Sequence, residues 1–447
     1  MADEGITTSP SATPGTATVH KVMRRLLPFL MICYLFSFID RVNLGFAALQ
    51  IDRDLHLGPA IIGFGGGLFF LAYFLFEVPS NLAMKKVGAR VWLARIMISW
   101  GLVSACMAFM TGPWSFYSLR FLLGAAEAGF FPGVLLYLTW WFPKEYRGRV
   151  VSMFYVAVPL SSFVGSPLSA ALLSLDGWMG LHGWQWLFIV EGMPSVLLGI
   201  ATLILLPDRP NQAKWLSLEE KTWLTETIER EQRQAKPVTV KSTWAILFHP
   251  QVLVLALIYA GSSAASNGLS LWQPKLLNSF GLTTMQTGLL NGIPFLLASI
   301  AMIYWGRRSD KTAERLWSTI LPLMLSAVAL ASCLLASSLT LTVVLLSLTL
   351  IGTYCFKGPF WALSTEMMGP QTAPAGLAQV NAIGNLAGFL ASSLIGIILQ
   401  ATNSYALALL PLVALEVIGC IVLGLTLRRI RLKNAAQATH PHQHSRV

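Results

Sequence analysis

The sequence predicts an all-α polytopic membrane protein with twelve transmembrane helices in two six-helix halves. Of its 447 residues, 55% are hydrophobic and only 11% are charged, and the mean hydropathy is +0.63. Soluble domains carry about 25% charged residues. Apolar runs of about 20 residues, the length that crosses a bilayer as a helix, recur along the chain. One long charged segment divides these runs into two sets of six.

The twelve spans follow from the apolar runs in chain order. The first half, residues 24–206, contains runs near residues 26–48, 60–82, 91–111, 115–141, 149–173 and 184–206. The second half, residues 251–427, contains runs near residues 251–274, 285–305, 317–337, 340–363, 374–400 and 404–427. Residues 207–250 form a polar stretch that is charged throughout as far as residue 238, and they predict a cytoplasmic helical linker, in which Ser217 and Glu220 have the spacing of a capping box.

The basic residues predict the orientation of the chain. They cluster before span 1 and after spans 2, 4, 8 and 12, which all fall on one side of a twelve-span protein. Cytoplasmic loops are enriched in Lys and Arg, so we expect both termini in the cytoplasm. Residues 1–23 predict a disordered tail because they are rich in small and polar residues. Residues 428–447 predict a second cytoplasmic tail, and we interpret its three histidines as solvated rather than metal-binding.

Composition and spacing exclude several other classes of protein. The net charge of +11 does not indicate nucleic-acid binding, because the basic residues lie in short clusters between apolar runs. The five cysteines lie inside apolar runs without paired spacing, which predicts neither disulfides nor a metal site. No catalytic constellation or large soluble domain is visible. We therefore expect neither an enzyme nor a bound cofactor.

Four charged residues stand out within the apolar spans. Asp40 and Arg41 lie inside span 1, and Arg120 and Glu127 lie on nearly one face of span 4, about two turns apart. A charge near the bilayer centre costs from about 2.5 to over 10 kcal/mol, so these side chains must face protein or water. We expect them at a common depth, where two acids and two arginines sum to zero charge.

This charged group has two interpretations. It could be a buried ion-pair network that only holds spans 1 and 4 together, although stability alone does not require four charges. Alternatively, an arginine could hold a carboxylate through its planar fork, and a buried carboxyl group beside it could take up a proton. Asp40 and Arg41 are adjacent, about 100° apart around the helix, so they cannot point the same way.

Two short basic loops occupy equivalent places in the two halves. The loop after span 2 contains Lys85 and Arg90, and the loop after span 8 contains Asp310 and Arg315. Parallel halves related by an axis along the membrane normal are a transporter architecture, so we expect these loops to take part in gating. Glu77, near the cytoplasmic end of span 2, is expected to brace the first of these basic turns.

The loop after span 8, from Gly306 to Arg315, resembles the GxxxD-(R/K)-x-(G)-x-R signature of the major facilitator superfamily. In the loop after span 2, Lys85 stands where that signature has its Asp. Other stretches resemble one branch, the anion:cation symporters: FSFIDRVNLGFA, EVPSNL, VGARVWLARIMISWG, RFLLGAAEAGFFPGVLLYLTWWFP, GSPLSAALL, GWQWLFIVEGMPSVLLG, GPFWAL and GLAQVNAIGNLAGFL. Within that branch the sequence is most similar to bacterial permeases for tartrate, phthalate, hydroxyphenylacetate and sugar acids.

The resemblance implies a monomeric, proton-coupled symporter that takes up a small organic anion across the bacterial inner membrane. The proton gradient then replaces any cofactor, and the partners are the anion, protons and lipid. The family pattern assigns proton coupling to Asp40 and Glu127, and substrate or gating roles to Arg41 and Arg120.

Three further residues are candidates for substrate contact: Tyr73 in span 2, Asn385 in span 11 and Trp361 in span 10. For Tyr73, packing in the core is an equally good interpretation. No role is assigned to three charged residues in the spans, Lys357, Glu191 and Glu416.

The alternative function is a proton-coupled exporter of drugs or metabolites with the same fold. Span 5 reads PLSSFVGSPLS and lacks the Gly-Pro-x-x-Gly-Gly pattern of those exporters. Arginines inside the membrane also favour anions over lipophilic cations. A sensor without transport activity finds no support in the sequence.

Overall fold

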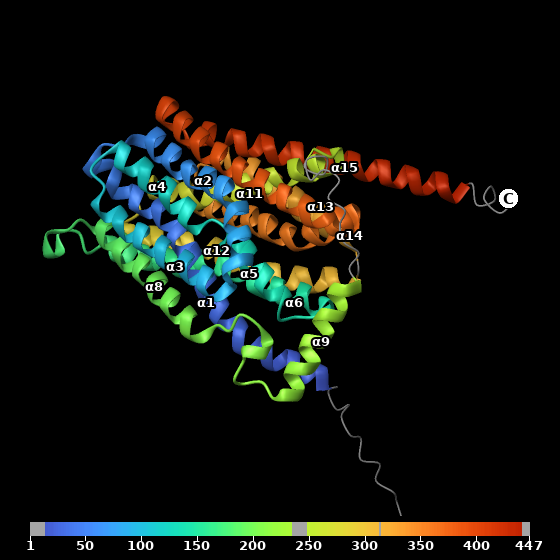
Figure 1. The fold of residues 1–447 in the computed structure, drawn as a ribbon. Coiled ribbons are helices and arrows are strands. Elements are labelled where there is room, and N and C mark those ends of the chain that lie inside the picture. Colours follow the sequence, from blue (N-terminus) through green and yellow to red (C-terminus); the bar gives the residue numbers. More distant parts are fainter. Residues whose placement is uncertain (1–13, 235–247, 313, 440–447) are drawn as a thin grey trace, which may run out of the picture.

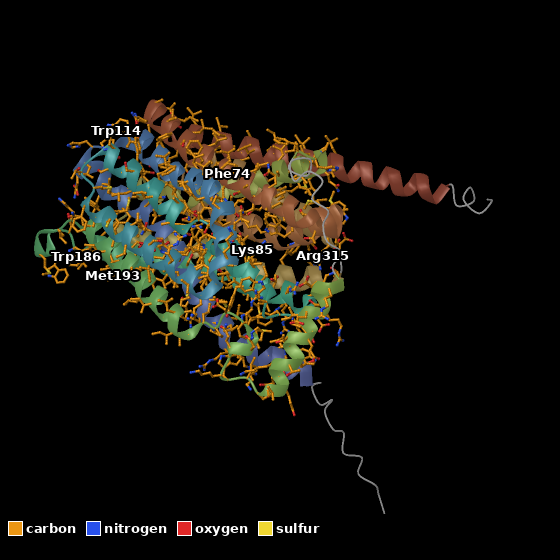
Figure 2. All side chains as sticks on the ribbon, viewed as in Figure 1. Phe74, Lys85, Trp114, Trp186, Met193 and Arg315 are labelled. Carbon is orange, nitrogen blue, oxygen red and sulfur yellow. The ribbon has the colours of Figure 1, made fainter. Side chains whose placement is uncertain are left out.

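The computed structural model describes residues 14–234, 248–312 and 314–439. Within these ranges, twelve helical segments are long and apolar enough to cross a membrane, which confirms the predicted number of spans. They form one bundle, shown in Figure 1, with α9 at one end. We call this the linker end of the bundle and the opposite end the far end. Figure 2 shows Lys85 and Arg315 toward the linker end, and Trp114 and Trp186 toward the far end.

The first half contains six spans, some of them built from two helices. They are α1 (Pro14–Leu55), α2 (Gly58–Val87), α3 (Ala89–Cys106) with η1 (Met107–Phe109), α4 (Pro113–Glu127) with α5 (Phe130–Thr139), α6 (Lys144–Tyr155) with α7 (Ala157–Leu173), and α8 (Gly183–Leu205). The short turn η2 (Trp178–Gly180) precedes α8.

The second half follows the linker, which contains η3 (Pro210–Gln212) and α9 (Leu218–Gln234). Its helices are α11 (Pro250–Asn278), α12 (Thr284–Thr312), α13 (Arg315–Cys333), α14 (Leu339–Thr402) and α15 (Tyr405–Thr439). Helix α14 carries two spans, Leu339–Met368 and Gly376–Thr402. The predicted capping box begins α9, because Glu220 N donates to Ser217 Oγ and Ser217 N donates to the Glu220 carboxylate.

Both predicted tails are partly helical. Helix α1 begins at Pro14, inside the tail predicted over residues 1–23. Val19 and Val22 are buried, and Lys21 pairs with Glu220 of α9 at 2.8 Å, so this turn of helix packs on the linker. At the C-terminal end of the described chain, α15 continues to Thr439 and extends beyond the bundle (Figure 1). The three histidines of the C-terminal tail lie outside the described residues.

Polar contacts join the two halves at the far end. Lys275 of α11 pairs with Asp52 of α1 at 2.5 Å, and the N–H of Ala60 donates to Gln400 of α14 at 2.9 Å. Helices α2 and α14 also approach closely, since a Cβ atom at Gly63 would lie only 2.5 Å from the backbone oxygen of Ser392. The two halves are therefore in direct contact at the far end, and the interface between them is closed there.

The position of the basic loops leads to a testable topology. Reporter fusions in the linker after Gln234 and after the C-terminus should both report the cytoplasm, because basic loops are retained there. A fusion at Gly281, in the far-end turn between α11 and α12, serves as the control and should report the opposite side. An extracytoplasmic C-terminus would contradict the orientation.

Candidate functional site

A cavity lies between the two halves and is lined by α1, α2 and the α5–α7 segment on one side and by α11 and α14 on the other. It comprises about 650 Å³ of space, including the part that is open to solvent. The cavity is lined by four residues to which the sequence assigns substrate binding or gating: Arg41, Tyr73, Asn385 and Trp361. The lining also includes Lys357, Asn267 and Asn381, so its polar groups come from both halves.

Arg41 and Glu127 form an ion pair at the wall of this cavity. Arg41 donates through Nε and Nη2 to the same oxygen, Glu127 Oε1, at 2.8 and 2.6 Å, and Ser37 Oγ donates to that oxygen at 2.7 Å. The other oxygen, Glu127 Oε2, is buried and has no hydrogen-bond partner among the described residues. The Arg41 guanidinium lies over the rings of Phe38 and Tyr73, 4.6 and 5.0 Å from their centroids. Its charge is thus directed to one carboxylate oxygen and to aromatic faces.

The helix that carries Glu127 breaks immediately after it. Helix α4 ends at Glu127, Ala128 is extended and Gly129 has a left-handed backbone with φ of 90°. A side chain at Gly129 would clash with Ser80 Oγ, so this position requires glycine. Discontinuous helices are found at the binding sites of membrane transporters. The apolar run of span 4 predicts one continuous helix, but Gly129 and Pro132 directly after Glu127 are residues typical of a helix end and are the signal in the sequence that could have indicated this break.

Asp40 points away from the cavity toward α3 and α8. Its carboxylate accepts hydrogen bonds from Trp100 Nε1 at 2.9 Å, Ser104 Oγ at 2.9 Å and Ser195 Oγ at 3.1 Å. It forms no ion pair with an arginine in the described part of the chain. The expected cluster of two acids and two bases is therefore divided, because adjacent residues of a helix face different neighbours.

Arg120 is buried and has no acidic partner in the described ranges. Within them it donates one long hydrogen bond, from Nε to the backbone oxygen of Gly65 at 3.4 Å, and Nη1 is without a partner. The guanidinium lies 5.1 Å from the centroid of the Phe69 ring. Arg120 and Arg41 both line a second, smaller cavity next to the first. Arg120 therefore has donors available for an anion.

Glu77 connects the two halves instead of bracing the basic turn after α2. Asn381 Nδ2 of α14 donates to Glu77 Oε1 at 3.1 Å, and Asn385 Nδ2 donates to Glu77 Oε2 at 3.5 Å. The expectation from the sequence was wrong because Glu77 lies on the face of α2 that packs against α14, where it is 7% exposed. This contact involves two cavity-lining asparagines and lies between the cavity and the linker end.

Removing this contact should open the cavity toward the linker end. We expect Glu77→Ala to raise the labelling rate of a cysteine placed at Asn267 by about fivefold, the effect of losing about 1 kcal/mol of hydrogen bonding between the halves. The measurement uses a polar thiol reagent and a variant without the native cysteines. Glu77→Gln keeps acceptor and donor groups and serves as the control. Equal labelling rates in all three proteins would count against a gate at Glu77.

Lys357 of α14 is a functional candidate to which the sequence alone assigns no role. Its ammonium donates to Ser266 Oγ at 3.2 Å and lies 4.8 Å from the centroid of the Tyr354 ring. It lines the cavity and is 5% exposed, so it does not reach the membrane surface. The signal in the sequence is a lone lysine in the middle of an apolar run, but no pattern indicates which face it occupies.

The residues of the two predicted basic loops lie at the ends of helices, because the helices extend beyond the apolar runs: Lys85 in α2, Arg90 in α3, Asp310 in α12 and Arg315 in α13. We keep the name basic loops for these two segments, which have different acidic partners. Arg315 pairs with Asp310 at 2.7 Å, and its Nε lies 3.7 Å from Glu366 at the end of span 10. In the first half, the backbone N–H of Arg90 donates to Asp208 Oδ1 at 2.8 Å. Asp208 lies just beyond α8, so it supplies an acid to the loop in which Lys85 replaces the acid of the signature. Both loops are thereby tied to a neighbouring span.

The remaining buried acids have hydroxyl donors. Ser169 Oγ donates to Glu191 at 2.7 Å, and Ser326 Oγ donates to Glu416 at 2.6 Å. Neither glutamate lines the cavity or forms an ion pair among the described residues. They remain without an assigned role.

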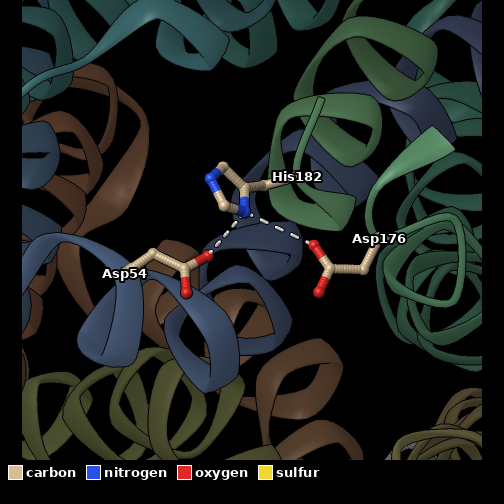
Figure 3. A group of neighbouring side chains, drawn as sticks. All are labelled: Asp54, Asp176 and His182. Carbon is tan, nitrogen blue, oxygen red and sulfur yellow. Dashed lines mark ion pairs between the residues drawn. The ribbon is translucent and has the colours of Figure 1, made fainter. Parts of the chain in front are cut away.

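A group of Asp54, Asp176 and His182 lies at the far end of the bundle (Figure 3). His182 Nδ1 lies 3.1 Å from Asp54 and 3.5 Å from Asp176. Arg53 pairs with both aspartates, at 2.9 and 3.4 Å. The Gly183 N–H, which donates to Asp176, and the nearby Arg53 lower the pKa of the Asp176 carboxyl group. Because the carboxylates already have these partners, the group is an ion-pair cluster that joins α1 to the loop before α8.

The fold and the cavity define a multi-pass membrane transporter. The Major Facilitator Superfamily model matches residues 30–392, and the chain belongs to this family. The chain is 46% identical over 429 residues to a protein of Agrobacterium vitis named "Putative tartrate transporter", covering 96% of this chain and 98% of that protein. It is 38% identical over 408 residues to a quinolone resistance transporter of Acinetobacter baumannii, covering 90% and 93%.

Solved structures support the same fold. A bacterial homologue of the human lysosomal transporter Spinster, in an inward-facing and occupied conformation, matches with a TM-score of 0.70 at 17% identity. The match covers 90% of this chain and 96% of that structure. The family and the fold confirm that the protein is a transporter and not an enzyme, and the relative from Agrobacterium vitis is consistent with the anion permeases that the sequence resembles.

Proposed function

We propose that this protein is a proton-coupled symporter that takes up a small organic carboxylate across the bacterial inner membrane. The observation that carries the proposal is the Arg41–Glu127 pair at the wall of a cavity between the two halves. Arginine binds carboxylates through a planar fork, so Arg41 and the unpaired Arg120 are suited to an anionic ligand. The name of the relative in Agrobacterium vitis supports a hydroxylated carboxylate of the tartrate class.

Proton coupling follows from competition for Arg41. While Glu127 is ionised, it accepts both hydrogen bonds from Arg41, so a substrate carboxylate would have to displace it. A proton from the cavity that binds to Glu127 removes this competition and leaves Arg41 free for the substrate. Substrate and proton then raise each other's affinity, as reciprocity of binding requires.

Asp40 is assigned to coupling in a different way. It lies on a face of α1 that does not line the cavity and is held by donors of α3 and α8. A proton on Asp40 would weaken these hydrogen bonds and loosen α1 from its neighbours. Its protonation would therefore favour movement of the helix that carries Arg41.

Closure of the far end supports transport by alternating access. The Asp52–Lys275 pair and the close packing of α2 on α14 join the halves there. Uptake requires the opposite arrangement as well, in which these contacts separate and the linker end closes. The basic loops with Lys85, Arg90, Asp310 and Arg315 lie at the end that would close.

The test is counterflow with the purified protein in proteoliposomes. Vesicles loaded with an unlabelled carboxylate are diluted into the same labelled compound, and the panel comprises tartrate, a sugar acid, phthalate and 4-hydroxyphenylacetate. We expect transient accumulation of at least one of them above the level in protein-free vesicles. Absence of counterflow for every carboxylate would reject the proposal.

A second candidate is a proton-coupled exporter, and one observation favours it. The relative in Acinetobacter baumannii is named a quinolone resistance transporter. Quinolones also carry a carboxylate, so the arginines alone do not separate the two functions. The same vesicles decide between them, because an exporter should show counterflow with a labelled fluoroquinolone and none with tartrate.

A further inference from the structure

Lys357 is a buried lysine that has no acidic partner in the described part of the chain. It is 5% exposed, and the one hydrogen bond it donates there goes to the neutral Ser266 hydroxyl. The nearest aromatic contacts are Tyr354, with the centroid at 4.8 Å, and Tyr155, at 5.9 Å. An ammonium group has three donors, and a buried charge is costly unless it is paired. Two of these donors are therefore available to a ligand in the cavity.

Arg41 and Lys357 face the same cavity from different halves of the molecule. Arg41 belongs to α1 and Lys357 to α14, and both belong to the lining. Arg41 is neutralised by Glu127 in the present arrangement, but not once that carboxylate carries a proton. The cavity then has one unbalanced cation on each side.

The charges around the cavity can be counted with Lys357 taken as protonated and Glu77 as ionised. The cations are Arg41, Arg120 and Lys357, and the acids are Glu127 and Glu77, which contacts the lining asparagines. With Glu127 ionised these groups carry one net positive charge, and with Glu127 protonated they carry two. A monoanion would leave one cation unbalanced in the second state, whereas a ligand with two negative charges makes the site neutral.

We propose that the substrate is a dicarboxylate and that Lys357 is its second anchor, holding one carboxylate while Arg41 holds the other. This inference rests on the proposed function, because it requires that a carboxylate binds in this cavity. The second anchor also links the halves, since each carboxylate is bound by a different half. A substrate of this kind would bring α1 and α14 together when it binds.

The experiment compares each dicarboxylate with its own monomethyl ester, which differs by one charge and one methyl group. The probes are tartrate, succinate and phthalate with their monomethyl esters, and binding to the purified full-length protein is measured by calorimetry. For the bound pair we expect the dicarboxylate to bind at least about tenfold more tightly than the ester, the usual effect of one charged hydrogen-bonding contact. An ester that binds as tightly as the dicarboxylate overturns the inference.

Variants of Lys357 test whether this residue binds the second carboxylate of the ligand. Lys357→Gln should weaken dicarboxylate binding by about tenfold or more and change binding of the ester by less than about twofold. Lys357→Arg keeps the charge and should retain most of the discrimination. Equal weakening of both ligands, or of neither, by Lys357→Gln would overturn the role of Lys357.

The two proposals fail in different ways. If the wild-type protein binds none of the acids or esters and shows no counterflow with any carboxylate, the proposed function fails and this inference fails with it. If it binds a dicarboxylate and its ester equally, only the second anchor is rejected. Should Lys357→Gln be unstable in detergent, the wild-type comparison of acid and ester still decides the substrate class.

Discussion

Glu127→Gln should abolish the accumulation of substrate that an imposed pH gradient drives, while exchange by counterflow continues. Glutamine resembles the protonated acid in shape and lacks its charge, so Arg41 is permanently available to substrate and no proton is carried with it. A pH difference of one unit supplies about 1.4 kcal/mol per coupled proton, enough for about tenfold accumulation. The variant should reach no more than the equilibrium level in proteoliposomes.

Two further variants make this result specific. Glu416→Gln changes another buried glutamate, which accepts a hydrogen bond from a serine hydroxyl but lies away from the cavity. This variant should accumulate substrate as the wild type does. Asp40→Asn should also lose pH-driven accumulation, because its hydrogen bonds to α3 and α8 no longer depend on a proton. If Glu127→Gln and Asp40→Asn both concentrate substrate, the charged residues are a structural ion-pair network and coupling occurs elsewhere.

Arg120→Lys should lower substrate affinity by roughly 10- to 100-fold although the positive charge remains. Hydrogen bonds to charged groups contribute about 1.5–3 kcal/mol, and lysine cannot reproduce the two parallel donors of the guanidinium. Arg120 lies in the second cavity next to Arg41, and its Nη1 has no partner among the described residues. Its free donors are therefore available to a substrate carboxylate, and the substitution removes them. The measurement is binding of the carboxylate that gives counterflow.

Arg95→Lys is the matched control for this substitution. Arg95 lies on α3 with its guanidinium 4.1 Å from the centroid of the Trp92 ring, and it does not line either cavity. Its replacement should leave affinity within about twofold of the wild type. Unchanged affinity in Arg120→Lys as well would show that Arg120 does not contact the carboxylate.

The number of spans and their division into two halves are predictable from the sequence alone. Backbone groups in a membrane must be satisfied internally, so an apolar run of sufficient length has few options besides a helix. For the same reason the charges inside those runs, such as Asp40, Arg41 and Lys357, stand out in the sequence as unusual. The break of α4 after Glu127 is not predictable in this way, since an apolar run continues through a kink as readily as through a straight helix.

The partners of the charged residues depend on the packing of the helices. Arg41 and Glu127 meet, while Asp40, one residue away, is held by Trp100 and two serines. Glu77 contacts asparagines that lie 304 and 308 residues further along the chain. Local periodicity gives the angle of a side chain around its own helix, but which helix lies opposite depends on how all twelve pack.

The membrane fold, the transporter family and the charged residues that a site would use can therefore be read from the chain itself. Which of these residues share the cavity is settled by the three-dimensional arrangement: Arg41 and Lys357 face it from opposite halves, and Asp40 does not line it. The physical reason is that a charge inside a membrane must face protein or a water-filled cavity instead of lipid, and the groups that face it come from helices distant in sequence.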